Sequence, residues 1–205
     1  MIIHDPMAIE KRSLEIISSE LDVEIPPENE AVVKRVIHCT ADFDYAKNLS
    51  FSEGAVEKAL AAFREGCDIV TDTNMAKSGI NKKAAAALGC EVHCFMGDAD
   101  VAEIAKQRGC TRATASMEKA MQLNKPLIFA IGNAPTALLT LRELIDAGKL
   151  NPKLIIGVPV GFVNILESKD AIMETNVPYI VARGRKGGSN VAAAIVNALM
   201  YQITR

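Results

Sequence analysis

The chain has 205 residues, of which 49% are hydrophobic and 23% are charged, and these fractions are typical of one globular domain spanning residues 1–205. Lysine and arginine number 23 against 25 acidic residues, and aromatic residues make up only 4%. The formal net charge of −2 and the shortage of rings able to stack on bases disfavour a nucleic-acid-binding protein.

No segment reaches the roughly 18 consecutive apolar residues of a membrane-spanning helix, and charged residues interrupt the N-terminus where a secretion signal would be apolar. The five cysteines are an odd number without a secretory context, which predicts reduced thiols. We therefore expect a cytoplasmic protein without a membrane partner.

The first part of the chain predicts helices. Apolar residues recur at helical spacing over about residues 5–39, with a break at Pro26-Pro27. Ser52 is expected to cap a further helix that ends at Gly66. We expect the N-terminal helices to flank the same sheet as the elements that follow.

Five short apolar runs then alternate with helix-sized segments. They are Ile69-Val70, Val92 to Phe95, Leu127 to Ile131, Leu154 to Val158 and Tyr179 to Ala182. One of the helices between them starts after Pro135 and stops before Gly148, and the last runs from about Asn190 to Tyr201. This alternation predicts an α/β fold with a single doubly wound, mostly parallel sheet, helices on both faces and extra N-terminal helices.

Small, polar or charged residues follow each predicted strand, in loops at 71–74, 97–98, 132–135, 159–161 and 183–189. In open α/β sheets ligands bind where such loops converge, at the carboxyl ends of the strands. Residues 183–189, the basic loop, contain Arg183, Arg185 and Lys186 among three glycines and open the last helix. They predict an anion site, with an ordinary solvated turn as the alternative.

The common nucleotide and hydrolase motifs are absent. No G-x-G-x-x-G follows a predicted strand, and neither G-x-x-x-x-G-K-[ST] nor G-x-S-x-G occurs. Cys90 and Cys94 flank His93, but without a second pair of ligands we interpret them as reduced core residues rather than as a metal site.

His38 is the histidine best placed for chemistry. Arg35 lies three residues earlier on the same predicted helix, so both side chains share one face near its end. A histidine beside a cation is a candidate acid or base next to an anion-holding arginine. A helix-end histidine that binds carbonyls is the alternative.

Several segments together resemble the precorrin-8X methylmutase family, also called cobalt-precorrin-8 methylmutase. They occur in the family's order and spacing from about Ser13 to Asn197. The segments are Arg35-Val36-Ile37-His38, Thr71-Asp72 with Met75 and Gly79, Thr111-Arg112, Gly132 to Leu138, Pro159 to Val163, Glu167-Ser168-Lys169 and Gly184 to Ser189.

This resemblance implies an isomerase of cobalamin biosynthesis. Such an enzyme moves a methyl group between neighbouring ring carbons of precorrin-8, or of its cobalt form, and gives hydrogenobyrinate or cobyrinate. It implies no methyl donor or redox cofactor, because the migrating methyl group is already on the substrate. We also expect no metal site. It also implies a homodimer.

The resemblance assigns residues as well. His38 matches the family's catalytic histidine, and protonation of the conjugated ring would make the shift easier. The positions expected to bind the substrate's carboxylates and ring are Ser13, Arg35, Arg112, Arg183, Arg185, Lys186, Gly187 and Gly188.

Two other functions remain open from the residues alone. One is a non-catalytic tetrapyrrole carrier that protects a labile intermediate. The other is an α/β enzyme acting on a sugar phosphate or nucleotide, with the basic loop holding phosphate. Tight binding without turnover would select the first, and stabilisation by phosphate compounds but not by corrinoids would select the second.

Overall fold

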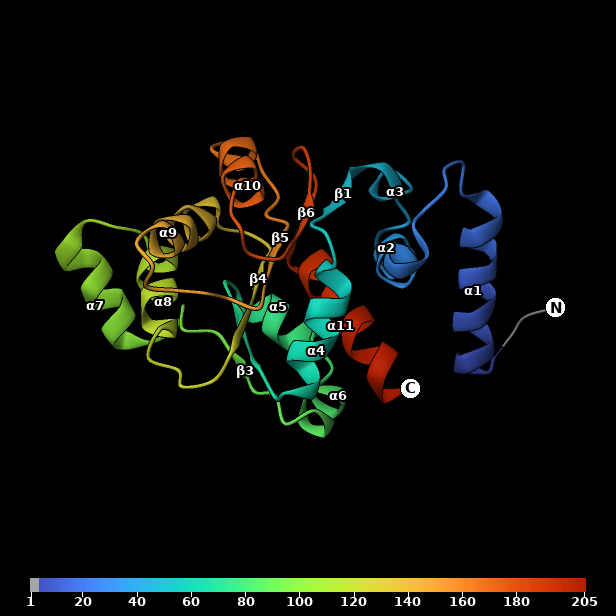
Figure 1. The fold of residues 1–205 in the computed structure, drawn as a ribbon, viewed down its shortest axis with the longest axis horizontal. Coiled ribbons are helices and arrows are strands. Elements are labelled where there is room, and N and C mark those ends of the chain that lie inside the picture. The colour runs from blue at the N-terminus through green and yellow to red at the C-terminus, as the bar shows by residue number, and fades with distance from the viewer. Residues whose placement is uncertain (1–3) are drawn as a thin grey trace.

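The computed structural model describes residues 4–205, which form one six-stranded sheet with helices around it (Figure 1). The strand order is β1-β6-β5-β4-β2-β3. Five strands are parallel, namely β2 (Asp68–Thr71), β3 (Val92–His93), β4 (Leu127–Ile131), β5 (Leu154–Gly157) and β6 (Tyr179–Ala182). β1 (Leu49–Phe51) pairs with β6 antiparallel. The predicted mostly parallel α/β sheet is confirmed.

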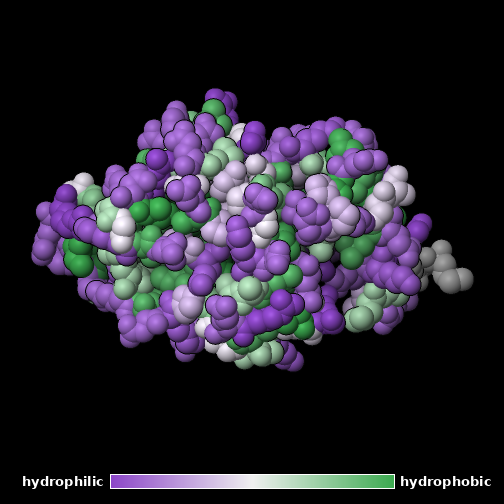
Figure 2. Space-filling model, viewed as in Figure 1, coloured by the Kyte–Doolittle hydropathy of each residue, from purple (hydrophilic) through white to green (hydrophobic). Residues whose placement is uncertain are grey.

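Helices cover both faces of the sheet (Figure 1). One face carries α4 (Ala55–Arg64), α5 (Asn74–Gly79), α6 (Lys82–Ala87) and α11 (Ser189–Thr204). The other carries α8 (Arg112–Ala120), α9 (Pro135–Asp146) and α10 (Ile165–Met173), with α7 (Ala99–Arg108) packed on α8. In the view of Figure 2 the surface is mostly hydrophilic, with hydrophobic residues in separate patches.

β4 shows how the sequence divides side chains between the two faces. Ile128 and Ala130 pack on the α11 side, whereas Leu127, Phe129 and Ile131 pack on the α8 to α10 side. All five residues are buried. A central strand covered on both faces appears as a continuous apolar run, which is why this strand is predicted at its observed bounds.

The N-terminal helices form layers of their own. α2 (Pro27–Thr40) packs on α11, and α1 (Pro6–Glu20) packs on α2. These helices therefore lie on one side of the sheet as outer layers, because α4 and α11 cover that face themselves. A short helix, α3 (Tyr45–Asn48), then leads into β1.

Ser52 does not cap α4, which begins after Gly54 in the left-handed conformation, with φ 66°. Its hydroxyl instead accepts a hydrogen bond from the Tyr179 N–H at 2.9 Å, just before the antiparallel pairing of β1 with β6. β3 is also shorter than predicted and ends at His93. Within residues 4–205, no helix has the length and apolar character needed to cross a bilayer.

Candidate active site

His38 lies on the exposed last turn of α2. The helix buries one stripe of side chains, so Arg35 and His38 fall on its outer side. The buried stripe consists of Val32, Val33, Val36 and Ile37. Ala41 ends the helix in the left-handed conformation, with φ 53°, and its N–H donates to the Ile37 carbonyl at 2.7 Å.

Two hollows lie beside His38. The larger, of about 400 Å³, is lined by His38 and Arg35 of α2, by Asn190, Asn197 and Tyr201 of α11, and by Cys39, Gly79, Ala193 and Ala194. The smaller, of about 260 Å³, places Ser13 of α1 beside His38, together with Ile16, Ile17, Glu20, Ile37, Ala41 and Phe43. The structure thus brings together Ser13, Arg35 and His38 from two helices.

Arg35 is held in place by an acidic partner. Its guanidinium donates to the Glu10 carboxylate and lies 5.4 Å from the centre of the Tyr201 ring. The hydrogen bond from Arg35 lowers the pKa of Glu10 below its usual range. Arg205 donates to the same carboxylate at 2.9 Å. Glu10 therefore offsets positive charge close to His38.

The wall of the larger hollow on α11 is joined to the turn after α5. Asn197 donates to the Gly79 carbonyl at 2.9 Å and accepts from the Asn81 N–H at 2.8 Å. A Cβ at Gly79 would lie 2.9 Å from the Ala193 side chain, so only glycine permits this close approach. These contacts fix the position of α11 opposite His38.

The basic loop leaves β6 and returns across the end of β5. The Gly188 N–H donates to the Val158 carbonyl at 2.8 Å. Gly187 has φ 157°, and a Cβ there would lie 2.1 Å from the same carbonyl oxygen. Any side chain at this position would push the loop away from β5, so glycine is required.

Lys186 ties the basic loop to the segment that follows α2. Its ammonium lies 2.6 Å from Asp42 and 2.6 Å from Asp44. These hydrogen bonds raise the pKa of Lys186 above its usual range. The loop therefore lies close to the chain that leaves His38, and a substrate carboxylate at Lys186 would compete with two acidic residues.

The other three arginines predicted to bind the substrate, Arg112, Arg183 and Arg185, are exposed. Arg183 donates to the Ser50 hydroxyl at 3.3 Å, and the Arg185 guanidinium lies 5.4 Å from the centre of the Phe162 ring. Arg112 opens α8, on the face of the sheet opposite to α2 (Figure 1). The structure therefore places Arg112 apart from the group formed by Ser13, Arg35 and His38.

The carboxyl ends of β2 and β4 meet at a buried carboxylate. Asp72 follows β2, is 0% exposed, and accepts hydrogen bonds from the N–H groups of Gly132, Asn133 and Ala134 at 2.9, 2.8 and 2.6 Å. Burial raises the pKa of Asp72, and the three N–H donors oppose that rise. A Cβ at Gly132 would lie 2.7 Å from the Ser189 backbone, so the start of α11 closes over this point.

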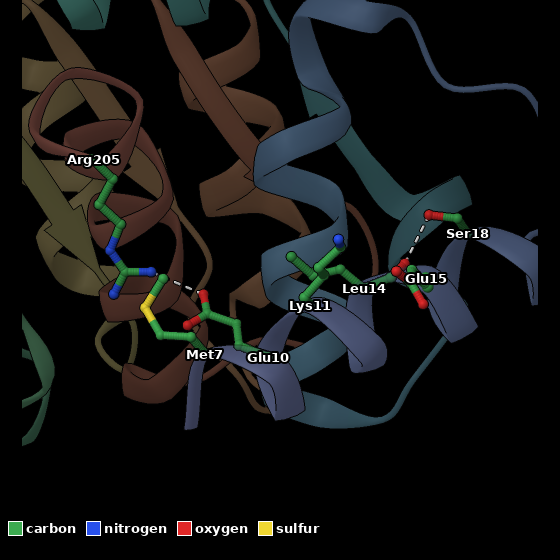
Figure 3. A pocket seen from close by; sticks show the side chains of 7 residues that line it. All are labelled: Met7, Glu10, Lys11, Leu14, Glu15, Ser18 and Arg205. Atoms are coloured by element: carbon green, nitrogen blue, oxygen red, sulfur yellow. Dashed lines mark hydrogen bonds and ion pairs between the residues drawn. The ribbon is translucent and has the colours of Figure 1, made fainter. Parts of the chain in front are cut away.

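A further hollow, of about 370 Å³, runs along α1 and contains none of the predicted site residues. Figure 3 shows Arg205 reaching toward Glu10 on one side, with Leu14 and Ser18 farther along the helix. Its connection to the site is indirect, since Glu10 also binds Arg35.

Comparison with known proteins decides the family. The sequence profile of precorrin-8X methylmutase matches residues 8–202. The chain belongs to the precorrin-8X methylmutase family. It is 45% identical to a cobalt-precorrin-8 methylmutase of Salmonella typhimurium, over 98% of this chain and 97% of that protein. A precorrin-8X methylmutase of Pseudomonas aeruginosa is 40% identical, over 96% of each chain.

A crystal structure agrees with this assignment. The precorrin-8X methyl mutase of Thermus thermophilus matches with a TM-score of 0.88 and 41% identity, over 95% of each chain. The fold of this methylmutase-family chain therefore follows the family over nearly its whole length. The roles assigned to individual residues stay predictions.

Sequence analysis missed several residues that organise the site of this methylmutase-family chain. Glu10, Asp42 and Asp44 act across long sequence separations and leave no local signal. Lys169 did leave one, because a lysine occupies the stripe of α10 that also buries Ile165 and Ile172.

Cys90, His93 and Cys94 lie in and around the short strand β3. Cys90 is buried, as expected for a core residue, and Cys94 lies half-buried just beyond β3. His93 Nε2 lies 3.1 Å from Asp68. Within residues 4–205, no group of three or more potential ligands is arranged to hold a metal ion.

Proposed function

We propose that this protein is an isomerase of cobalamin biosynthesis that moves a methyl group between adjacent ring carbons of precorrin-8 or cobalt-precorrin-8. Membership of the methylmutase family over residues 8–202 is the observation that carries the proposal. The product is hydrogenobyrinate or cobyrinate, according to whether the ring holds cobalt.

His38 is the proton donor and acceptor in this proposal. A proton on the conjugated ring withdraws electrons and lowers the barrier for the methyl shift, and a positioned acid contributes roughly 10²- to 10⁴-fold to a rate. Its place between two hollows supports the role, because a ring lying against α2 would meet the imidazole directly.

The cations of the basic loop suit a substrate with many carboxylates. Among residues 4–205, Arg183 and Arg185 have no carboxylate within ion-pair distance, so they are available to a substrate. Exposed apolar side chains accompany them, with Phe162 80% and Val163 75% exposed in the loop after β5. Apolar and basic groups side by side fit a macrocycle with an apolar face and an acidic rim.

The protein is also a homodimer in this proposal. The family resemblance is the support for this state.

The experiment that tests the function is a comparison of wild type, His38→Ala and His4→Ala on both precorrin-8 and cobalt-precorrin-8. His4 is exposed and lies outside the site, so His4→Ala is the matched control. His38→Ala is expected to lower kcat by about 10²-fold or more and to leave the product's dissociation constant within about threefold.

Each alternative gives a different result. Wild-type turnover by His38→Ala contradicts the proton-donor role. Tight binding of hydrogenobyrinic acid without turnover by any variant selects a carrier. Stabilisation by phosphate compounds but not by corrinoids selects a phosphate-binding enzyme. The ratio of kcat/KM for the two substrates shows which form is natural.

A further inference from the structure

Lys169 of α10 is a buried lysine with an unusual set of partners. It is 1% exposed, and its Nζ donates to the carbonyl oxygens of Gly184 at 2.7 Å and Lys186 at 3.0 Å. Burial lowers the pKa of Lys169 to about 8. Burying an ammonium without a carboxylate partner costs free energy. A lysine held at this position by two carbonyls alone therefore calls for a reason why the chain keeps it there.

Both carbonyls belong to the basic loop, and their direction fixes the direction of two N–H groups. In a trans peptide the N–H points opposite to the carbonyl of the preceding residue. The chain contains no cis peptide among its described residues. With the carbonyls of Gly184 and Lys186 turned toward Lys169, the N–H groups of Arg185 and Gly187 point away from it, toward the outside of the loop.

Among residues 4–205 these two N–H groups have no acceptor, and neither do those of Gly184 and Lys186. The Gly188 N–H binds the Val158 carbonyl at 2.8 Å, and the Arg185 carbonyl accepts from the Gly161 N–H at 3.2 Å. The loop is thus fixed on either side of them. Two backbone donors one residue apart form a concave site of the kind that binds an anion.

We propose that Lys169 is a positioning residue for the substrate: it holds the Gly184 and Lys186 carbonyls inward so that the Arg185 and Gly187 N–H groups together bind one substrate carboxylate. The inference rests on the proposed function, which supplies the carboxylate. The single ammonium of Lys169 also polarises both peptide groups whose carbonyls it contacts, and this strengthens the N–H on the far side of each as a donor.

The test compares wild type, Lys169→Met and Ser168→Ala. Ser168 is the neighbouring buried polar residue of α10, and its hydroxyl binds the Ile165 carbonyl at 3.0 Å, within its own helix. Lys169→Met is expected to raise KM by about tenfold or more and to leave kcat within about threefold. The reason is that the lost contact to the carboxylate binds the substrate and the transition state equally, so its loss weakens binding without slowing the bound substrate's reaction. Ser168→Ala is expected to leave both constants unchanged.

A spectroscopic readout separates positioning from a structural role. Titration of ¹⁵N-labelled wild type with hydrogenobyrinic acid is expected to move the amide proton resonances of Arg185 and Gly187 downfield, and Lys169→Met is expected to abolish the movement. Lys169→Gln keeps two N–H donors on a shorter chain and is expected to fall between the two.

Two results overturn the inference alone. The first is that the wild type converts the substrate but the amide proton resonances of Arg185 and Gly187 do not shift on titration. This result needs only the wild type, so it holds even when the Lys169 variants do not fold. The other is a fall in kcat with unchanged KM in Lys169→Met. A wild type that converts neither form of precorrin-8 overturns the proposed function itself, and with it the carboxylate assigned to these amides.

Discussion

At the scale of single residues, the charge near His38 is set by a residue that is distant in sequence. Glu10 of α1 accepts from Arg35 and from Arg205, so one carboxylate faces two guanidinium groups. Without Glu10 the guanidinium of Arg35 would be uncompensated in the hollow that it shares with His38. α1 therefore supplies both Ser13 and the charge balance of the site.

Glu10→Gln is expected to lower the free energy of unfolding by about 1 kcal/mol at pH 7. The pKa of Glu10 is lowered from 4.5 by the hydrogen bond from Arg35, so the carboxylate stabilises the folded state above pH 4.5. This contribution is lost as the pH falls through the lowered pKa. Urea unfolding at several pH values should therefore show the wild type and Glu10→Gln converging in acid.

Glu15→Gln is the matched control for this prediction. Glu15 lies on the same helix and pairs with Arg12 at 3.2 Å, but its side chain is 50% exposed. An exposed pair of this kind contributes little, so its removal should change stability by less than about 0.5 kcal/mol. Equal losses in the two variants would show that Glu10 has no special place in the network.

The residues predicted from motifs and those found only in the structure differ in a physical way. His38 and Arg35 share a helix face, and spacing along one helix is readable from the sequence. Glu10 meets Arg35 across 25 residues, and Lys169 meets Gly184 across 15. Such contacts depend on how elements pack, which local spacing does not encode.

At the scale of elements, the order in which the chain adds strands to the sheet reverses between β2 and β4, where the buried carboxylate of Asp72 lies. The chain runs from β2 to β3 on one side and then returns to place β4 on the other side of β2. In open α/β sheets this reversal opens a crevice between the two strand ends. Here Asp72 fills it by binding three N–H groups of the turn after β4.

Asp72→Asn is expected to destabilise the protein by about 2 to 3 kcal/mol, because the new amide would turn an N–H donor toward backbone N–H donors and leave a buried group unpaired. The midpoint of urea unfolding, with an unchanged slope, measures this loss. Asp98→Asn is the control. Asp98 lies in another loop at the carboxyl ends of the strands and pairs with Lys119, but the Asp98 side chain is 38% exposed. It should cost less than about 1 kcal/mol.

The elements missed by sequence analysis are the short ones. β1 has three residues and exists through its pairing with β6, more than a hundred residues later, so no local pattern predicts it. The helices between β2 and β4 did leave signals in their caps. The side chains of Thr73, Asn81 and Thr111 each accept an N–H at a helix start, as N-cap residues do.

At the scale of the whole molecule, one hydrophobic cluster runs from the outer helices to the sheet. Ile17 of α1 belongs to the same cluster as Val33 of α2, Ile195 of α11 and Ile156 of β5. The N-terminal helices therefore share a hydrophobic core with the α/β sheet. Because they pack into that common core, we expect them to unfold together with the sheet.

A single cooperative unfolding transition is therefore expected, with equal calorimetric and van't Hoff enthalpies per cooperative unit. In the proposed homodimer its midpoint should also rise with protein concentration, because association stabilises the folded state by mass action. Scanning calorimetry over about a hundredfold range of concentration checks both. Two transitions would contradict the single domain, and a constant midpoint would contradict the dimer.

The two edges of the sheet have a consequence for aggregation. β1 has three residues and β3 has two, so each edge exposes only a few unpaired backbone groups. Long, flat edge strands are the templates on which foreign strands add. Both edges are shorter than the strands at the centre of the sheet, so they offer a poor template for a strand of a second molecule, and this disfavours fibre growth by strand addition.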